Sequence, residues 1–264
     1  MAQDENSEIR SFPINLLREG IIFLELPIFR ELAPSGFDYG KVFLVEFESQ
    51  SLWYEASFTI AADALKRGIR TEYHTYAHLP NEIRQTLTGY GLNPNDLEQK
   101  KILRILDSYT IQVGLGTPEA PPFKTPQKVM TESVKVADWS IVDAQTMKAP
   151  SEEDMRWLHV DDNVSALANY NDEKAILNYW RTRIIPSARK LQTAFVNALL
   201  LEVHSDSFYK QFEALCDGIL DFRSRESDNG LVHKARVKVI RGKSYTSKWR
   251  PLRLKENGEV ALAD

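Results

Sequence analysis

The sequence predicts an α/β protein whose largely parallel β-sheet is covered by helices on both faces. Up to residue 218, strand-like apolar runs alternate with helix-like amphipathic segments. Alternation at this spacing is typical of βαβ units. After residue 218, strand-like runs follow one another without intervening helices. We therefore expect an antiparallel extension of the sheet at the C-terminal end.

Local patterns define each element. Residues 42–47 form an apolar run that suits a strand buried on both faces. The helix predicted at 52–66 closes on Lys66-Arg67-Gly68, a typical C-terminal stop, and Ser205 is a plausible N-cap for a later helix. On these grounds we predict strands at 41–47, 71–77, 102–107, 157–162, 193–203 and 218–223, and helices at 52–66, 80–89, 172–190 and 205–216.

The C-terminal strands are predicted at 219–225, 232–241 and 252–255. The intervening sequences "ESDNG" and "KENGE" have the chemistry of hairpin turns. Residues 1–12 are polar and read as a flexible tail, and residues 13–264 as a single domain. The Gly- and Pro-rich segment 114–127 interrupts the alternation and is predicted to be a long surface loop.

The composition limits the class of protein. The net charge is −4, so the molecule as a whole is not built to attract nucleic acid or acidic lipid. A single cysteine excludes an internal disulfide and fits a reducing compartment. No apolar stretch reaches the length of a membrane span, and the acidic N-terminus is not a signal peptide. We expect a soluble cytoplasmic protein with no membrane partner.

The segment 40–68 has the layout of a phosphate-binding loop without its chemistry. A strand leads through a short connection into a helix, which is how many proteins cradle phosphate. The connection, "ESQSL", contains neither glycine nor lysine, and Trp53 and Tyr54 follow it directly. Glu46, Glu48 and Glu55 add negative charge, and no cation appears before Lys66.

With this order of elements, the sequence resembles the KaiC-like branch of the RecA-fold ATPases from about residue 15 to the end. The segments that carry the resemblance are "EYHTYAHLPNEI", "KILRILDSYT", "WLHVDDNVSALANYNDE", "LCDGILDFR" and "VKVIRGKSYTSKWRPLRL". Their ordered series is more specific than any one of them. The resemblance implies a RecA-like fold, with the Walker A unit at 40–68 and the Walker B strand ending near Asp162.

The resemblance also implies that the nucleotide site is degenerate. The cradle glycines of the family fall on positions such as Phe47, Gln50 and Leu52, the phosphate-binding lysine on Trp53, the magnesium-binding hydroxyl on Tyr54, and the catalytic glutamate pair on Ala77 and His78. Asp162 remains at the Walker B position, with Asp161 beside it. Of the Lys-x-Arg that reaches a neighbouring subunit's nucleotide, the lysine position is Val239 and Arg241 is kept. We therefore expect no catalytic residues and no cofactor; the alternative is weak binding of Mg-ATP.

The remaining acidic, histidine and cysteine residues that could bind a metal or act as a nucleophile are expected to have structural roles. Asp161 and Asp162 could hold a metal, but they offer magnesium few oxygens without phosphate. We therefore expect the pair to have a structural role at the strand end, capping the turn at 163–165. Zinc binding by His74, His78 and His159, converging at a sheet edge, is one hypothesis. The three lack the spacing of zinc motifs, so we expect hydrogen-bonded histidines and no metal site. Cys216 lies on the apolar face of a helix and is expected to be an inert core thiol.

Two groups of residues leave a binding role open. Trp53 and Tyr54 either fill the former phosphate volume or pack against a neighbouring subunit, or they stack on a base or a small ring. We favour the filling of the former phosphate volume. The C-terminal stretch is basic with interleaved aromatics, and its candidate residues are Arg236, Lys238, Arg241, Lys243, Tyr245 and Trp249. They form either a subunit interface, facing Glu46, Glu48 and Glu55 of the next protomer, or a surface for single-stranded DNA.

Taken together, the sequence favours a non-catalytic KaiC/RecA-like protein that acts as a regulatory or scaffold subunit through assembly. Its predicted partners are copies of itself, or an active KaiC/RecA-like ATPase in a mixed ring. One alternative is an ATP-binding member of the RecA superfamily with a remodelled site, in signal transduction or DNA repair. The other is a single-stranded nucleic-acid-binding module.

Overall fold

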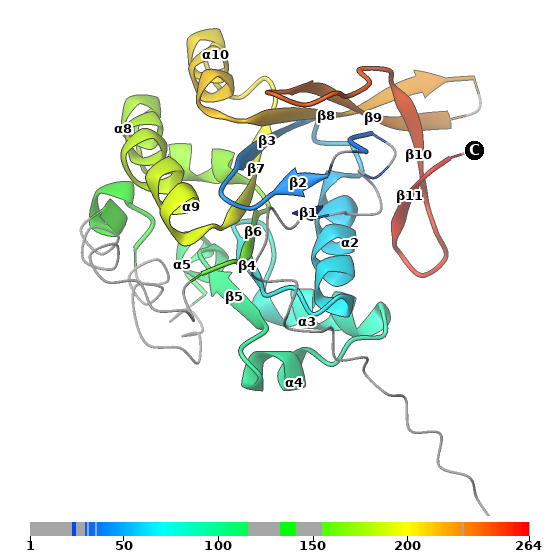
Figure 1. Cartoon of the computed structure of the whole chain (residues 1–264), viewed down its shortest axis with the longest axis horizontal. Coiled ribbons are helices and arrows are strands. Elements are labelled where there is room, and N and C mark those ends of the chain that lie inside the picture. Colours follow the sequence, from blue (N-terminus) through cyan, green and yellow to red (C-terminus); the bar gives the residue numbers. More distant parts are fainter. Residues whose placement is uncertain are drawn as a thin grey trace, which may run out of the picture.

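A nine-stranded sheet forms the centre of the molecule (Figure 1). The computed structural model describes residues 23–24, 30, 32–34, 36–115, 133–140, 155–228 and 230–263. The predicted tail and most of the predicted loop at 114–127 lie outside these residues. The strands are β3 (Val42–Phe47), β4 (Thr71–Thr75), β5 (Leu103–Asp107), β6 (Leu158–Asp161), β7 (Ala194–Leu200), β8 (Gly218–Ser227), β9 (Gly230–Ile240), β10 (Arg250–Leu254) and β11 (Val260–Leu262).

The strand order is β11-β10-β9-β8-β3-β7-β6-β4-β5. Strands β8, β3, β7, β6, β4 and β5 pair in parallel. Strands β9, β10 and β11 then add antiparallel pairs at the β8 edge. The predicted α/β class and the antiparallel C-terminal extension are confirmed. Two further short strands, β1 (Phe23–Leu24) and β2 (Phe37–Asp38), pair separately.

Helices pack on both faces of the sheet. On one face lie α2 (Trp53–Lys66), α3 (Pro80–Gly89) and α4 (Pro94–Gln99), and on the other α8 (Glu173–Tyr179), η4 (Trp180–Ile184), α9 (Ile185–Leu191) and α10 (Asp206–Leu215). Two shorter elements, α5 (Tyr109–Val113) and η3 (Val164–Asn169), follow strand ends. The structure describes no helix that is both long and apolar enough to cross a membrane.

The alternation of side chains along β3 shows how the two faces are built. Phe43, Val45 and Phe47 join the core under α2, whereas Val42 and Leu44 join the core under α8 and α10. We call these the α2 face and the α10 face. Glu46 has the parity of the α10 face and is 2% exposed. The strand therefore buries a carboxyl group among its apolar residues.

Three local predictions can be compared with the structure. Ser205 is the N-cap of α10, and its side chain accepts a hydrogen bond from the Phe208 backbone N–H. The helix predicted at 172–190 is interrupted by the π-helical turn η4, which ends two residues before Pro186. Proline has no N–H to continue the α-helical ladder, which accounts for the change of hydrogen-bond pattern there. The predicted turns at "ESDNG" and "KENGE" connect β8 to β9 and β10 to β11.

Candidate functional site

The connection between β3 and α2 is closed by its own side chains. Glu48 accepts a hydrogen bond from the Ser224 backbone N–H at 2.7 Å and lies 3.5 Å from Arg223 Nη1. Ser51 donates its hydroxyl hydrogen to the Glu48 carbonyl at 2.7 Å. Gln50 is exposed, and its carbonyl accepts from Ser224 Oγ at 2.9 Å. Strand β8 therefore holds this connection in place.

Trp53 is the first residue of α2 and is fully buried. Its ring packs edge-on against Phe222 at 5.4 Å between centroids, and Phe47 lies at 6.2 Å. The indole Nε1–H donates to the Asp162 backbone carbonyl at 2.7 Å. The prediction that Trp53 is a packing residue is confirmed, and its hydrogen bond links the start of α2 to the end of β6.

Tyr54 is half-buried beside Trp53. Its hydroxyl accepts a hydrogen bond from Asn163 Nδ2 at 3.1 Å, and its ring contacts His78 edge-on at 5.0 Å between centroids. Burial and the nearby Asp162 carboxylate raise the pKa of Tyr54 to about 12. The phenol is therefore neutral at physiological pH and acts as a packing and hydrogen-bonding group.

Asp162 is fully buried, and its carboxylate is occupied by groups from the end of β4. Oδ1 accepts from the Tyr76 backbone N–H at 2.8 Å, and Oδ2 accepts from Thr75 Oγ1 at 3.0 Å. His78 Nδ1 lies 3.2 Å from the same Oδ2. The expected structural role is confirmed, but the expected target is wrong: Asp162 stabilises the end of β4 rather than the turn at 163–165. The β4–β6 pairing brings the two strand ends together.

Asp161 points to the opposite face from the Trp53 site, into a buried polar cluster. Its Oδ1 lies 3.1 Å from His74 Nδ1, 3.2 Å from His159 Nε2 and 3.3 Å from the Tyr76 hydroxyl. Of the three histidines considered as converging, His74 and His159 meet here, whereas His78 contacts Asp162 instead. The sequence feature that could have predicted this cluster is the alternation of polar residues. Glu72, His74 and Tyr76 in one segment, and His159 and Asp161 in another, are two positions apart and therefore share one face of a strand.

The electrostatics of this cluster are dominated by paired charges. Burial alone would lower the pKa of His159, but the charge of Asp161 and the hydrogen bonds to Asp161 and Glu72 raise it to about 10. Burial would raise the pKa of Glu72, whereas the His159 hydrogen bond and charge lower it to about 2. His159 likewise holds the pKa of Asp161 well below its usual range, against the effect of burial.

The basic residues of the C-terminal strands are largely paired within the chain. Arg236 Nε donates to Asp221 Oδ2 at 2.6 Å, Lys238 Nζ to Glu46 Oε2 at 3.0 Å and to Glu213, and Lys243 to Asp38. The predicted opposition of Glu46 and Lys238 across a subunit interface is therefore wrong. Strands β3, β8 and β9 are neighbours, and both side chains lie on the α10 face, where they meet directly.

The remaining candidates of that stretch are more accessible. Arg241 is exposed, and its Nε donates to the Cys216 backbone carbonyl at 3.0 Å. Tyr245 is 37% exposed. The half-buried Trp249 ring carries two cations, with Arg236 at 4.5 Å and Lys234 at 4.8 Å from its centroid. Such contacts are typical of cation–π pairs.

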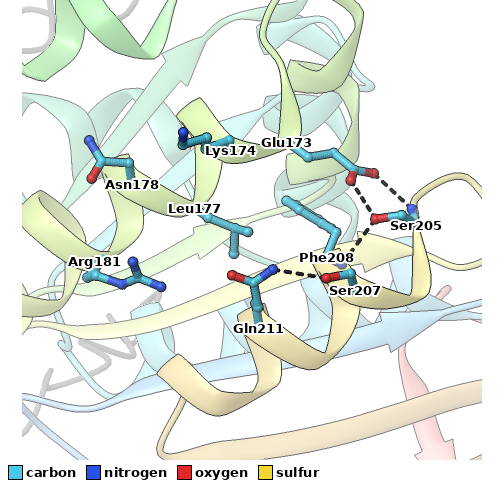
Figure 2. A pocket seen from close by; sticks show the side chains of 9 residues that line it. All are labelled: Glu173, Lys174, Leu177, Asn178, Arg181, Ser205, Ser207, Phe208 and Gln211. Atoms are coloured by element: carbon cyan, nitrogen blue, oxygen red, sulfur yellow. Dashed lines mark hydrogen bonds between the residues drawn. The ribbon is translucent and has the colours of Figure 1, made fainter.

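Two further features lie on the α10 face. A groove of about 390 Å³ runs between α8 and α10; Figure 2 shows Leu177 and Phe208 in its wall and Lys174 and Arg181 on the α8 side. At one end, Glu173 accepts hydrogen bonds from the Ser205 backbone N–H and hydroxyl. Cys216 is 2% exposed, and burial raises the pKa of its thiol, in agreement with an inert core residue.

Comparison with known proteins supports the fold. No protein-family model matches the sequence, and no curated protein matches it. The crystal structure of a KaiC-like protein from the hyperthermophilic archaeon Pyrococcus horikoshii superposes on this chain with a TM-score of 0.68. The two share 14% sequence identity, and the match covers 93% of this chain and 100% of that one. The strand order and this similarity together show that the chain has a KaiC/RecA-like fold.

Proposed function

We propose that this protein is a KaiC/RecA-like protein that does not hydrolyse ATP and acts as a regulatory or scaffold subunit through assembly. The observation that carries the proposal is the burial of Trp53 at the start of α2. Phosphate binding at a helix start needs converging backbone N–H groups, free space and a cation. Here a fully buried indole, bonded to the Asp162 carbonyl, lies at that helix start.

The residues around this helix start also lack the groups that ATP hydrolysis needs. Asp162 is the residue that the resemblance to the KaiC-like family assigns to the magnesium site. Both of its carboxylate oxygens already accept hydrogen bonds from residues at the end of β4. Orientation of an attacking water needs a polar group close to the γ-phosphate. Ala77 has none, and the imidazole of His78 is directed to Asp162. Several requirements fail together, which favours loss of hydrolysis over a single unusual substitution.

Assembly is proposed from exposed apolar side chains of the C-terminal extension. Among the described residues, large hydrophobic side chains are exposed there at Leu231 (42%), Val232 (43%), Tyr245 (37%) and Leu254 (50%). Leu231 and Val232 lie near the tip of the β8–β9 hairpin, which projects from the sheet (Figure 1). Exposed apolar groups at one end of a sheet are suited to a second copy or to an active KaiC/RecA-like ATPase.

The test combines nucleotide titration with solution mass. Isothermal titration of the full chain with Mg-ATP should give no heat in the micromolar range, and phosphate release should stay at the level of buffer. Light scattering should show an oligomer that a Leu231→Asp/Val232→Asp double variant dissociates. Val203→Asp is the matched control, because Val203 is 54% exposed in the turn before α10.

Different outcomes separate the parts of the proposal. A stoichiometric Mg-ATP isotherm with turnover would overturn the non-hydrolysing assignment and favour a remodelled ATPase of signal transduction or DNA repair. A wild-type monomer that also fails to join an active KaiC-like ATPase would overturn assembly.

Single-stranded DNA is the second candidate partner. The observation in its favour is Trp249, which lies beside Lys234 and Arg236, with the exposed Tyr245 on the same stretch of chain. Aromatic rings next to cations can stack on bases while the cations contact phosphate. Retardation of single-stranded DNA that weakens with salt and is lost in Trp249→Ala would support this surface. Unchanged mobility at low salt would exclude it.

A further inference from the structure

Four side chains from two neighbouring strands converge at one point on the α10 face. His74 and Tyr76 come from β4 and the residue that follows it, and His159 and Asp161 come from β6. The possible ligand atoms of His74, His159 and Asp161 all lie within 4.8 Å of one another, and all three residues are buried. The Tyr76 hydroxyl lies 3.0 Å from His74 Nδ1 and 3.3 Å from Asp161 Oδ1.

The strand register builds this arrangement. In the parallel β4–β6 pair, Glu72 is opposite His159 and His74 is opposite Asp161. Side chains two residues apart on a strand share a face. Polar side chains at every second position on both strands therefore form a compact block in an otherwise apolar sheet.

In each histidine, the ring nitrogen that faces away from Asp161 contacts a second partner. His159 Nδ1 lies 2.6 Å from Glu72 Oε1, which orients His159 Nε2 toward Asp161. His74 Nε2 lies 2.8 Å from Ser108 Oγ, which orients His74 Nδ1 toward the same carboxylate. Metal-binding histidines are usually held in this way, because an outer acceptor fixes the tautomer and the ring orientation.

We propose that His74, His159 and Asp161 form a buried binding site for a zinc ion, with the Tyr76 hydroxyl as the fourth ligand. Two ligand atoms that each lie about 2.0–2.1 Å from a tetrahedral zinc ion are about 3.3 Å apart. The separations of 3.0–3.3 Å around Asp161 Oδ1 and the Tyr76 hydroxyl match that spacing. The ligand atoms of His74, His159 and Asp161, all within 4.8 Å of one another, would draw together around a zinc ion.

The types of ligand atom indicate which metal would bind, and the residues around them indicate its role. Two imidazoles with one carboxylate suit zinc rather than magnesium or calcium, which prefer oxygen ligands. The Trp139 ring lies 5.7 Å from His74, and the Phe195 ring 4.6 Å from His159. These apolar rings and the burial of all three ligand residues keep the site away from solvent, so we assign it a structural role that joins β4 to β6.

The first experiment measures metal binding by the full chain. The protein is made metal-free by dialysis against a chelator and then titrated with Zn²⁺ in competition with a chromophoric chelator. We expect one equivalent of tight binding and a higher Tm of the zinc-loaded protein. Co²⁺ should give the intense visible absorption of a tetrahedral site. A folded wild-type chain that takes up no Zn²⁺ would overturn the proposal and leave a hydrogen-bonded ion network.

Variants locate the site. His74→Gln and His159→Asn should abolish stoichiometric binding, and Glu72→Gln should weaken it about 10–100-fold, the usual effect of losing an outer partner. His78→Gln is the matched control, because His78 is four positions from His74 but contacts Asp162 instead. If a ligand variant does not fold, the wild-type Co²⁺ spectrum decides: weak octahedral absorption overturns the proposal. Equal zinc binding by wild type and folded His159→Asn would also overturn it.

Discussion

The two faces of the sheet differ in how they fill the space between strands and helices. On the α2 face, the strands contribute mainly apolar side chains, and Trp53 closes the core at the carboxyl end of β3. On the α10 face, the same strands bury ionisable groups: Glu46, His74, Arg104, His159, Asp161 and Asp221, with the largely covered Glu72 beside His159. These groups contact one another or cations of neighbouring strands.

The adjacent residues Asp161 and Asp162 show what this difference means. Asp162 is bound by a backbone N–H and a hydroxyl next to the Trp53 site, whereas Asp161 is bound by two histidines on the other face. One position along the chain therefore changes the main partners of the carboxylate from a backbone N–H and a hydroxyl to the paired histidines of the other face. A buried charge needs such partners, because burial without them costs several kcal/mol.

The largest expected change in the free energy of unfolding comes from substitutions on the α2 face. Trp53→Ala should lower the free energy of unfolding by about 3–5 kcal/mol, because it empties a fully buried volume. Trp53→Phe keeps most of the packing but leaves the Asp162 carbonyl without its donor, and should cost about 1–3 kcal/mol. Urea unfolding measures both. A Trp53→Ala variant as stable as wild type would show that the ring contributes no packing energy.

A smaller effect is expected at the end of β4. Asp162→Ala removes the acceptor of the Tyr76 N–H and the Thr75 hydroxyl and should cost about 2–3 kcal/mol. Asp172→Ala is the matched control: Asp172 caps α8 at its surface, and its loss should cost about 1 kcal/mol. Equal costs measured by thermal unfolding would contradict the importance of burial at Asp162.

On the α10 face, the buried Glu46 should make the free energy of unfolding depend on pH. Burial, together with the neighbouring Glu213, raises the pKa of Glu46 from 4.5 to about 8, against the effect of Lys238. Between these values the unfolded chain is ionised at this residue while the folded chain holds a proton. Stability from this group is therefore complete below about pH 4.5 and is lost as the pH rises toward about 8.

Glu46→Gln mimics the protonated side chain and should remove this loss. We expect wild type and variant to be similarly stable at acidic pH, and the variant to be the more stable above about pH 8. Urea unfolding across this range gives the difference directly, since Glu213 and Lys238 are present in both proteins. Parallel pH curves for the two proteins would mean that Glu46 is ionised in the folded state.

The smallest effect is expected outside both cores. Trp249→Ala removes the cation–π contacts with Lys234 and Arg236 at a half-buried position and should cost about 1 kcal/mol or less. The same variant should leave the solution mass unchanged if Leu231 and Val232 carry assembly. A loss of stability as large as that of Trp53→Ala would place Trp249 in the core rather than on a surface.

Much of the fold was predictable because its signals are local. The strand at 42–47, the Ser205 cap and the two hairpin turns each depend on residues close together in the sequence. The π-helical turn before Pro186 and the short helix α4 were missed. In α4, the pair Asn93-Pro94 offered a usable signal, since Asn93 caps the helix and Pro94 begins it.

The sequence by itself determined the alternation of strands and helices along the chain, the antiparallel extension, and the absence of glycine from the connection that precedes α2. The tertiary structure alone decided which polar groups meet. Lys238 reaches Glu46 across 192 positions, and His74 meets Asp161 because β4 and β6 pair in one register. Such contacts depend on strand order and register, which are set by packing the whole sheet, and no local pattern of residues encodes them.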